Sequence, residues 1–301
     1  MAEWSPFRAY VPVARRGFFS WQDWLCVAAL LGASAWLWHS ASRLPQYEWQ
    51  WPLLGEFLIA HGRNGGLEAG LLLRGLFTTL RVGIWTFLFS LLLGGLLGIL
   101  ASRKSFRLPC AAVINLIRNT PPLVILFVVY FFAGNLLPVA ELEALVRKLP
   151  PFGKTLVAWV FAPAGQMDRM LAAILALGAY QAAYVAEITR GAIASVPRGQ
   201  WDASRSLGFG RWQTIWLVIL PQAARSMLPP LTGQCISTFK DSALASLISL
   251  PDLTFQSLEI MAVSSMTFEI WISAAVIYLL VGAVCACLGN LLENRYSRHI
   301  R

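Results

Sequence analysis

The chain has 301 residues, of which 57% are hydrophobic and only 13% are charged, and its formal net charge at pH 7 is +9. This balance is the reverse of what the surface of a soluble enzyme requires. It predicts an all-α polytopic membrane protein, because the apolar runs are continuous where the strands of a β-barrel would alternate. In such a protein, loop arginines that fix orientation explain the positive charge better than a nucleic-acid partner does.

Six transmembrane helices are predicted. Three uncharged runs show the required length most clearly, from Val82 to Ser102 (21 residues), Asn119 to Ala140 (22 residues) and Ile270 to Leu292 (23 residues). The last run would span roughly 34 Å as a helix, against a hydrocarbon core of about 30 Å. The six expected helices cover approximately 24–38, with flanking small residues, then 71–101, 111–137, 170–188, 221–249 and 268–292.

The first third of the chain holds a basic arm, one helix and a connection. Arg15 and Arg16 superficially resemble a twin-arginine export signal, but a retained first helix is the preferred interpretation. Residues 44–68 contain Pro, Gly and the neighbouring Trp49 and Trp51, so we expect an extramembrane connection with aromatic side chains at the membrane interface.

Breakers and polar residues mark the later helices. Pro121 and Pro122 remove two backbone donors and should kink or break the third helix. Residues 138–169 read as a polar loop whose apolar stretch, 156–161, is too short to cross a bilayer. The fifth helix is polar for a membrane span and contains Pro229 and Pro230.

The interval 189–221 is the longest one between hydrophobic segments of the second half that still reads as helix. Pro197 fits an early helical position, and Gly208 stands where a left-handed residue would end a helix. We therefore expect a short helix of about two turns between two longer ones. On the side of the termini and this loop the chain has 15 Lys and Arg residues, against seven on the other side, which predicts that both termini and the loop are cytoplasmic.

This interval also resembles a known family. Asp202-Ala203-Ser204-x-x-x-Gly208 followed by Ile219-Leu220-Pro221 is similar to the Glu-Ala-Ala loop of bacterial ABC importer permeases, with Asp for the usual Glu and Ser for the second Ala. Further short motifs between about residues 70 and 290 resemble those of the polar amino-acid uptake group, the histidine, glutamine and glutamate-type permeases. These motifs are Arg118-x-Thr120-Pro121, Ala182-Ala183-Tyr184-x-Ala186-Glu187-x-x-Arg190-Gly191, Gly199-Gln200-Trp201, Leu220-Pro221-Gln222-Ala223 and Lys240-Asp241-Ser242-x-Leu244.

The resemblance implies a type I ABC importer permease fold with one extra N-terminal helix. It divides the chain into residues 1–69 (arm, extra helix and periplasmic connection), a five-helix core at 70–292 with the coupling loop 189–221, and a basic cytoplasmic tail at 293–301. The implied function is import of polar amino acids, or similar small zwitterions, across the bacterial cytoplasmic (inner) membrane by alternating access. The implied partners are an ABC ATPase dimer, a second permease subunit and a periplasmic solute-binding protein.

The residues themselves show no ATPase site, and the resemblance implies a transport subunit whose ATP and Mg²⁺ are held by the partner subunits. Gly153-Lys154-Thr155 ends like a phosphate-binding loop, but Lys148 occupies the position of its first glycine and no strand precedes it. Neither a nucleophile–base set nor a metal-ligand cluster is visible, and Cys285 and Cys287 are interpreted as small packing residues. The alternative is an ion-coupled secondary transporter of small polar solutes, for which no internal repeat is visible.

Two sets of residues are candidates for function. The first would couple the chain to the ATPase through a helix at 197–211, although the segment could also be a basic loop that only orients the protein. It consists of Gln200, Trp201, Asp202, Ala203, Ser204, Arg205 and Gly208. The second would line the substrate path, because polar side chains that face lipid are costly, although each could instead be structural. It consists of Arg118, Thr120, Tyr180, Gln181, Tyr184, Glu187, Gln234, Ser237, Lys240 and Asp241.

Overall fold

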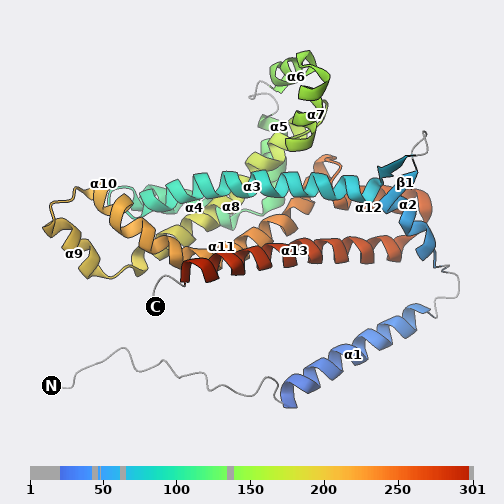
Figure 1. Cartoon of the computed structure of the whole chain (residues 1–301), viewed down its shortest axis with the longest axis horizontal. Helices are drawn as coiled ribbons and strands as arrows, with labels where there is room; N and C mark the ends of the chain where they lie inside the picture. The colour runs from blue at the N-terminus through green and yellow to red at the C-terminus, as the bar shows by residue number, and fades with distance from the viewer. Residues whose placement is uncertain (1–20, 43–46, 48, 62–65, 134–138, 298–301) are drawn as a thin grey trace. The chain divides into compact units, whose positions relative to one another are not determined.

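The computed structural model describes residues 21–42, 47, 49–61, 66–133 and 139–297 (Figure 1). The basic arm before residue 21 and the last four residues of the predicted tail lie outside this part of the chain. The chain divides into two units between Trp49 and Gln50, and each is described by itself. The first unit contains the 22-residue helix α1 (Trp21–Ser42), which corresponds to the first helix predicted from the sequence.

The second unit begins with a small cap. A 3₁₀ turn, η1 (Trp51–Leu53), leads into α2 (Leu54–Leu58) and a short antiparallel hairpin of β1 (Ile59–His61) and β2 (Leu67–Ala69), in which Ile59 pairs with Ala69. The remaining elements are α3 (Leu71–Ala101), α4 (Arg107–Asn119), α5 (Pro122–Ala133), α6 (Val139–Lys148), α7 (Pro151–Val160), α8 (Met167–Ser195), α9 (Arg198–Ser206), α10 (Arg211–Gln213), the π-helical turn η2 (Thr214–Ile219), α11 (Leu220–Asp241), the 3₁₀ helix η3 (Ser242–Ile248), α12 (Leu253–Ser264) and α13 (Thr267–Ser297).

Helices α3 and α8 form the main contact of this unit, and small residues let them approach closely. Gly94 and Gly98 lie one turn apart on α3 and face Ala182 and Ala186 on α8. A Cβ atom at Gly94 would lie 2.5 Å from the carbonyl oxygen of Ala182, and one at Gly98 would lie 2.6 Å from that of Ala186. The two backbones are therefore in direct contact across this stripe.

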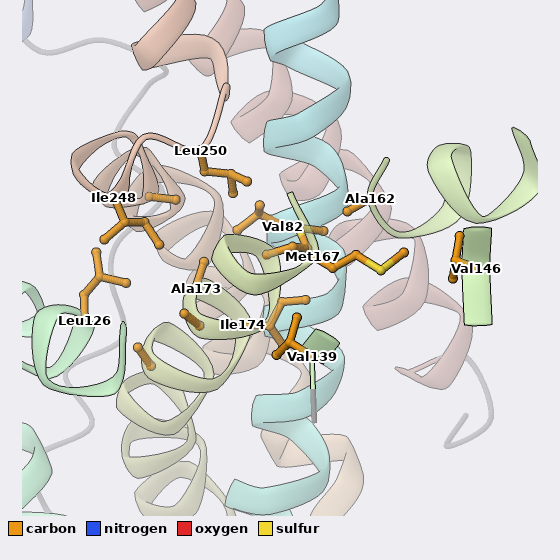
Figure 2. Close-up of a cluster of buried hydrophobic side chains, with 14 residues drawn as sticks. Val82, Leu126, Val139, Val146, Ala162, Met167, Ala173, Ile174, Ile248 and Leu250 are labelled. Carbon is orange, nitrogen blue, oxygen red and sulfur yellow. The ribbon is translucent and has the colours of Figure 1, made fainter. Parts of the chain in front are cut away.

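The N-terminal third of α8 forms one wall of an apolar cluster. Met167, Ala173 and Ile174 of α8 gather with Leu126 of α5 and Ile248 of η3, and all five side chains are buried (Figure 2). Because the five residues come from three separate elements, this cluster fixes α5 and η3 against α8.

The third predicted helix is broken at the two prolines. Helix α4 ends at Asn119, α5 begins at Pro122, and their axes differ by 101°. The prediction of a kink or break is confirmed, because Pro cannot donate the backbone hydrogen bonds that would continue α4.

Several of the expected boundaries are wrong: α4 begins at Arg107, four residues early, and α13 continues to Ser297, five residues beyond the expected end. Helix α8 continues seven residues beyond the expected end at Ile188, because small and apolar residues up to Ser195 keep the helix packed on the end of α3. The expected fifth helix, 221–249, ends as an α-helix at Asp241 and tightens into η3. The polar loop expected after Pro138 contains α6 and α7, two short helices.

The described residues include three helices that are long and apolar enough to cross a membrane, α3, α8 and α13, or four if α4 and α5 together make one span. The predicted count of six is therefore not confirmed. Helix α11 packs along α13 for much of its length but carries Arg225, Lys240 and Asp241, and the apolar part of α1 is short.

The ends of the bundle carry different elements (Figure 1). The α3–α4 connection, α9 and the C-terminal end of α13 lie at one end, and α2, the hairpin and α12 lie at the other. At the second end, the backbone N–H of Leu253 donates to the Thr79 hydroxyl (3.0 Å) and the carboxylate of Asp252 accepts from the backbone N–H of Phe255 (2.8 Å). The first bond attaches the start of α12 to α3, and the second caps the N-terminus of α12.

Candidate functional site

Helix α9 is a separate nine-residue helix that connects α8 to α11. Pro197 stands just before its first residue, in extended conformation, and the Pro197 carbonyl accepts a hydrogen bond from the N–H of Gln200 (3.0 Å). The expected early helical position for this proline is thus displaced by one residue, to the position that caps the helix. A proline is tolerated there because the first backbone donors of a helix have no partner within it.

Gly208 ends α9 as the sequence predicts. Its φ of 79° is left-handed, its N–H bonds to the carbonyl of Arg205 (2.9 Å), and the N–H of Phe209 bonds to the carbonyl of Ser204 (3.1 Å). These two bonds define a Schellman motif, which satisfies the last carbonyls of the helix and reverses the chain. No other atom lies within 4 Å of where a Cβ at Gly208 would be, so backbone conformation alone favours glycine here.

Three sides of α9 differ in their surroundings. Arg198, Trp201, Asp202 and Arg205 line a hollow next to the ends of α3 and α8. Ser204 is buried, and its hydroxyl donates to the Thr214 hydroxyl in η2 (3.1 Å).

The remaining side of α9 carries small or apolar residues that are exposed to solvent. Gly199 and Ala203 lie on this outer side, followed by Ser206 and Leu207 at the helix end. Gln200 borders the outer side, and its side-chain oxygen accepts a hydrogen bond from Gln222 of α11 (3.3 Å). One side of α9 is therefore open, while the opposite sides are tied to the rest of the chain.

The connection from α9 to α11 is also held by an aromatic contact. The guanidinium of Arg103, in the α3–α4 connection, lies 3.6 Å from the centroid of the Trp212 ring, a cation–π geometry. Beyond Trp212 the chain winds as the π-helical turn η2 before α11 begins at Leu220. Neither Arg103 nor Trp212 was a candidate from the sequence, because a lone Arg and a lone Trp in separate loops carry no signal that they will stack.

The predicted path residues fall into two groups. In the first, the hydroxyls of Tyr180 and Tyr184 lie 3.1 Å apart on α8, and the guanidinium of Arg118 lies 5.1 Å from the centroid of the Tyr184 ring. Thr120 sits at the break between α4 and α5, where its hydroxyl donates to the Leu116 carbonyl (2.8 Å). This group brings the broken helix and α8 together through polar and aromatic side chains.

The second group connects α8 to α11. Gln181 is buried; its amide nitrogen donates to a carboxylate oxygen of Asp241 (2.8 Å), and its amide oxygen accepts from Gln234. The structure does not bring the other two α11 candidates into this group, since Lys240 is exposed and Ser237, though half-buried, makes no side-chain bond to it.

Glu187 forms an ion pair with Arg190, with a nitrogen–oxygen distance of 2.7 Å. The pair is partly exposed near the end of α8. Within the described residues, no group of three or more His, Cys, Asp or Glu side chains gathers as a metal site.

The described residues thus combine long apolar helices with a short helix, α9, at one end of the bundle. The family model described as "Binding-protein-dependent transport system inner membrane component" matches residues 64–298. The chain belongs to this family. The match confirms the resemblance to ABC importer permeases that was inferred from the sequence motifs. It disfavours the alternative of an ion-coupled secondary transporter.

Curated relatives are amino-acid permeases. The chain is 42% identical to the glutamine transport system permease protein GlnP of Escherichia coli K12 over 130 residues, which cover 43% of this chain and 59% of GlnP. The match therefore spans less than two thirds of that relative. It is 30% identical to the L-cystine transport system permease protein TcyB of Bacillus subtilis over 229 residues, which cover 75% of this chain and 86% of TcyB.

Solved structures show the same fold. A crystal structure of an amino acid ABC transporter with histidines matches with a TM-score of 0.58 and 30% identity, covering 75% of this chain and 94% of that chain. The MetNI methionine ABC transporter in an inward-facing conformation matches with a TM-score of 0.57 and 19% identity, which shows the fold alone. The predicted type I ABC importer permease fold is confirmed.

Proposed function

We propose that this chain is the membrane-spanning subunit of an ATP-driven importer that moves polar amino acids, or similar small zwitterions, into the cytoplasm. The observation that carries the proposal is the construction of α9: one side is open for a partner, and another is bonded through Ser204 to Thr214 of η2, the turn that leads directly into α11. A push on α9 would therefore reach a long helix of the bundle.

The same geometry suggests how the motion reaches the substrate path. Helix α11 carries Gln234 and Asp241, and both bond to Gln181 of α8. A shift of α11 relative to α8 would rearrange this polar group, and alternating access requires two such arrangements. We propose that all ten candidates named from the sequence belong to the path, with the two bonded groups at its centre.

The partners follow from the family. An ABC ATPase dimer would contact the open side of α9, which includes Ala203 and is bordered by Gln200, and would hydrolyse ATP with Mg²⁺. A second permease subunit would complete the pore, and a periplasmic solute-binding protein would deliver the substrate. Names of relatives support the substrate class, since GlnP is a glutamine permease, TcyB an L-cystine permease, and the solved neighbour an amino acid transporter.

The proposed orientation places α9 and the C-terminus in the cytoplasm. The described end that carries α9 and the α3–α4 connection is rich in Arg and Lys. This distribution is the one expected for the cytoplasmic side of an inner-membrane protein.

The test is reconstitution in proteoliposomes. Proteoliposomes that contain the chain and its ATPase should accumulate labelled glutamine or cystine only when ATP and the solute-binding protein are present on opposite sides of the membrane. Uptake by the chain alone, driven by an ion gradient, would contradict the proposal. A cysteine at Ala203, on the outer side of α9, should crosslink to the ATPase, while a cysteine at Leu67, in the hairpin at the other end of the bundle, serves as the control.

A further inference from the structure

A basic pocket lies beside α9, on a different side of this helix from the open one that is proposed to meet the ATPase. Its volume is about 700 Å³, and the ends of α3 and α8, the first residue of α4 and one side of α9 line it. This volume is within the range of small-molecule sites, about 300–1,000 Å³.

Arginines dominate the lining. Arg107, Arg190, Arg198 and Arg205 contribute four positive charges, and Asp202 contributes the single carboxylate. Arg190 is paired with Glu187 and Arg205 lies 3.8 Å from Asp202. Among the residues that the structure describes, Arg107 and Arg198 pair with no carboxylate, so the pocket retains positive charge for an anion.

Apart from Ser102, the rest of the wall is apolar, including Ile193, Val196 and the half-buried Trp201. The pocket thus suits a molecule with an anionic part and an apolar part better than it suits a small inorganic anion. It also lies where α3 and α8 end, which is the level of the lipid headgroups if these helices span the bilayer.

The neighbouring helix α4 offers a surface for the apolar part. It starts at the pocket with Arg107 and then exposes Leu108 and Leu116, whose side chains are 82% and 70% accessible. A molecule held by its phosphate in the pocket could therefore lay hydrocarbon chains along α4.

We propose that this pocket binds the phosphodiester headgroup of an anionic phospholipid from the cytoplasmic leaflet. Basic pockets between transmembrane helices on that side commonly hold such headgroups. Because Arg198 and Arg205 belong to α9, the bound lipid attaches this helix to the membrane on the side opposite to its open face. The lipid would thereby limit how far α9 swings away from the bundle.

The test is native mass spectrometry of the purified full-length chain titrated with phosphatidylglycerol or with phosphatidylcholine. The wild type should hold phosphatidylglycerol more tightly than phosphatidylcholine. Arg107→Gln and Arg198→Gln should each weaken phosphatidylglycerol binding about five-fold, the fold-change that corresponds to one surface arginine. Lys104→Gln also removes one positive charge, from the α3–α4 connection next to Arg107, but Lys104 does not line the pocket. This variant should bind phosphatidylglycerol as tightly as the wild type does.

Three results would overturn the proposal. Unchanged phosphatidylglycerol binding in Arg107→Gln and Arg198→Gln would show that the pocket holds no headgroup. An equal loss in Lys104→Gln would show a general charge effect. Inorganic phosphate binding as tightly as phosphatidylglycerol, measured by calorimetry, would assign the pocket to a free anion. Two arginine variants are used because they lie on different elements, so a folding defect in one leaves the other informative.

Discussion

Replacing Gly208 by alanine tests whether the left-handed end of α9 matters for coupling. A side chain at φ 79° has open space around it, since nothing lies within 4 Å of a Cβ, so the only cost is the backbone conformation. That cost is roughly 1–2 kcal/mol for a residue other than glycine. It should be expressed as local opening of the helix end, because the Schellman bonds of Gly208 and Phe209 depend on this conformation.

The assay is hydrogen exchange of the backbone amides of Gly208→Ala, followed in the reconstituted transporter. A destabilisation of about 1–2 kcal/mol should speed exchange at the position-208 and Phe209 amides about five- to thirty-fold, since 1.4 kcal/mol corresponds to a factor of ten. Transport per ATP hydrolysed should fall in the same variant.

Two control variants make this result specific. Gly208→Asn should recover much of the wild-type behaviour, because Asn adopts left-handed conformations more readily than other residues with a side chain. Gly199→Ala lies within α9, also in open space, and should leave exchange at these two amides unchanged or slightly slower. Exchange in Gly208→Ala within two-fold of wild type would refute the reasoning, as would an equal effect of Gly199→Ala.

Three other substitutions probe the bundle. Gly94→Val should destabilise the α3–α8 contact by about 3 kcal/mol and lower the yield of folded protein in size-exclusion chromatography, whereas Gly95→Val, which meets no neighbour, should not. Gln181→Leu leaves Asp241 without its 2.8 Å donor and should cost about 2 kcal/mol, seen as a lower Tm in detergent. Glu187→Gln should reduce uptake while leaving Tm nearly unchanged, since side chains that are 29% and 39% exposed make a weak ion pair; unaltered uptake would remove this residue from the path.

Features that depend on the backbone conformation of a single residue or of neighbouring residues could be predicted well from the sequence. Gly208 ends α9 and the prolines break the third helix because each acts through its own backbone conformation. The polar residues of α8 and α11 could be assigned to helix faces by periodicity. Their partition into a tyrosine group with Arg118 and an amide–carboxylate group around Gln181 depends on how the two helices are rotated against each other, which periodicity does not determine.

Contacts between segments that lie far apart in the chain could not be predicted from the sequence. The burial of Ser204 against Thr214 could not be expected from a serine whose small size suggested only close approach. The basic pocket combines Arg107 with residues more than eighty positions later in the chain, so no short motif in the sequence predicts it. Helix count was the weakest prediction, because α11 owes its place to packing on α13 and lacks the apolarity that identifies a span.

The wide turn η2 has a consequence for how the chain tolerates change in length. A π-helical turn contains about one residue more than an α-helical turn, so the six residues from Thr214 to Ile219 place α9 at a particular angle around the axis of α11. Because the π turn absorbs an extra residue, removing a single residue there would permit ordinary α-helical winding and leave the angle between α9 and α11 nearly unchanged. Removing a residue from the α-helical part of α11 would instead rotate everything before it by about 100°. In that second case the open side of α9 would point away from the proposed ATPase, so η2 is the place between α9 and α11 where the loss of one residue disturbs the proposed contact least.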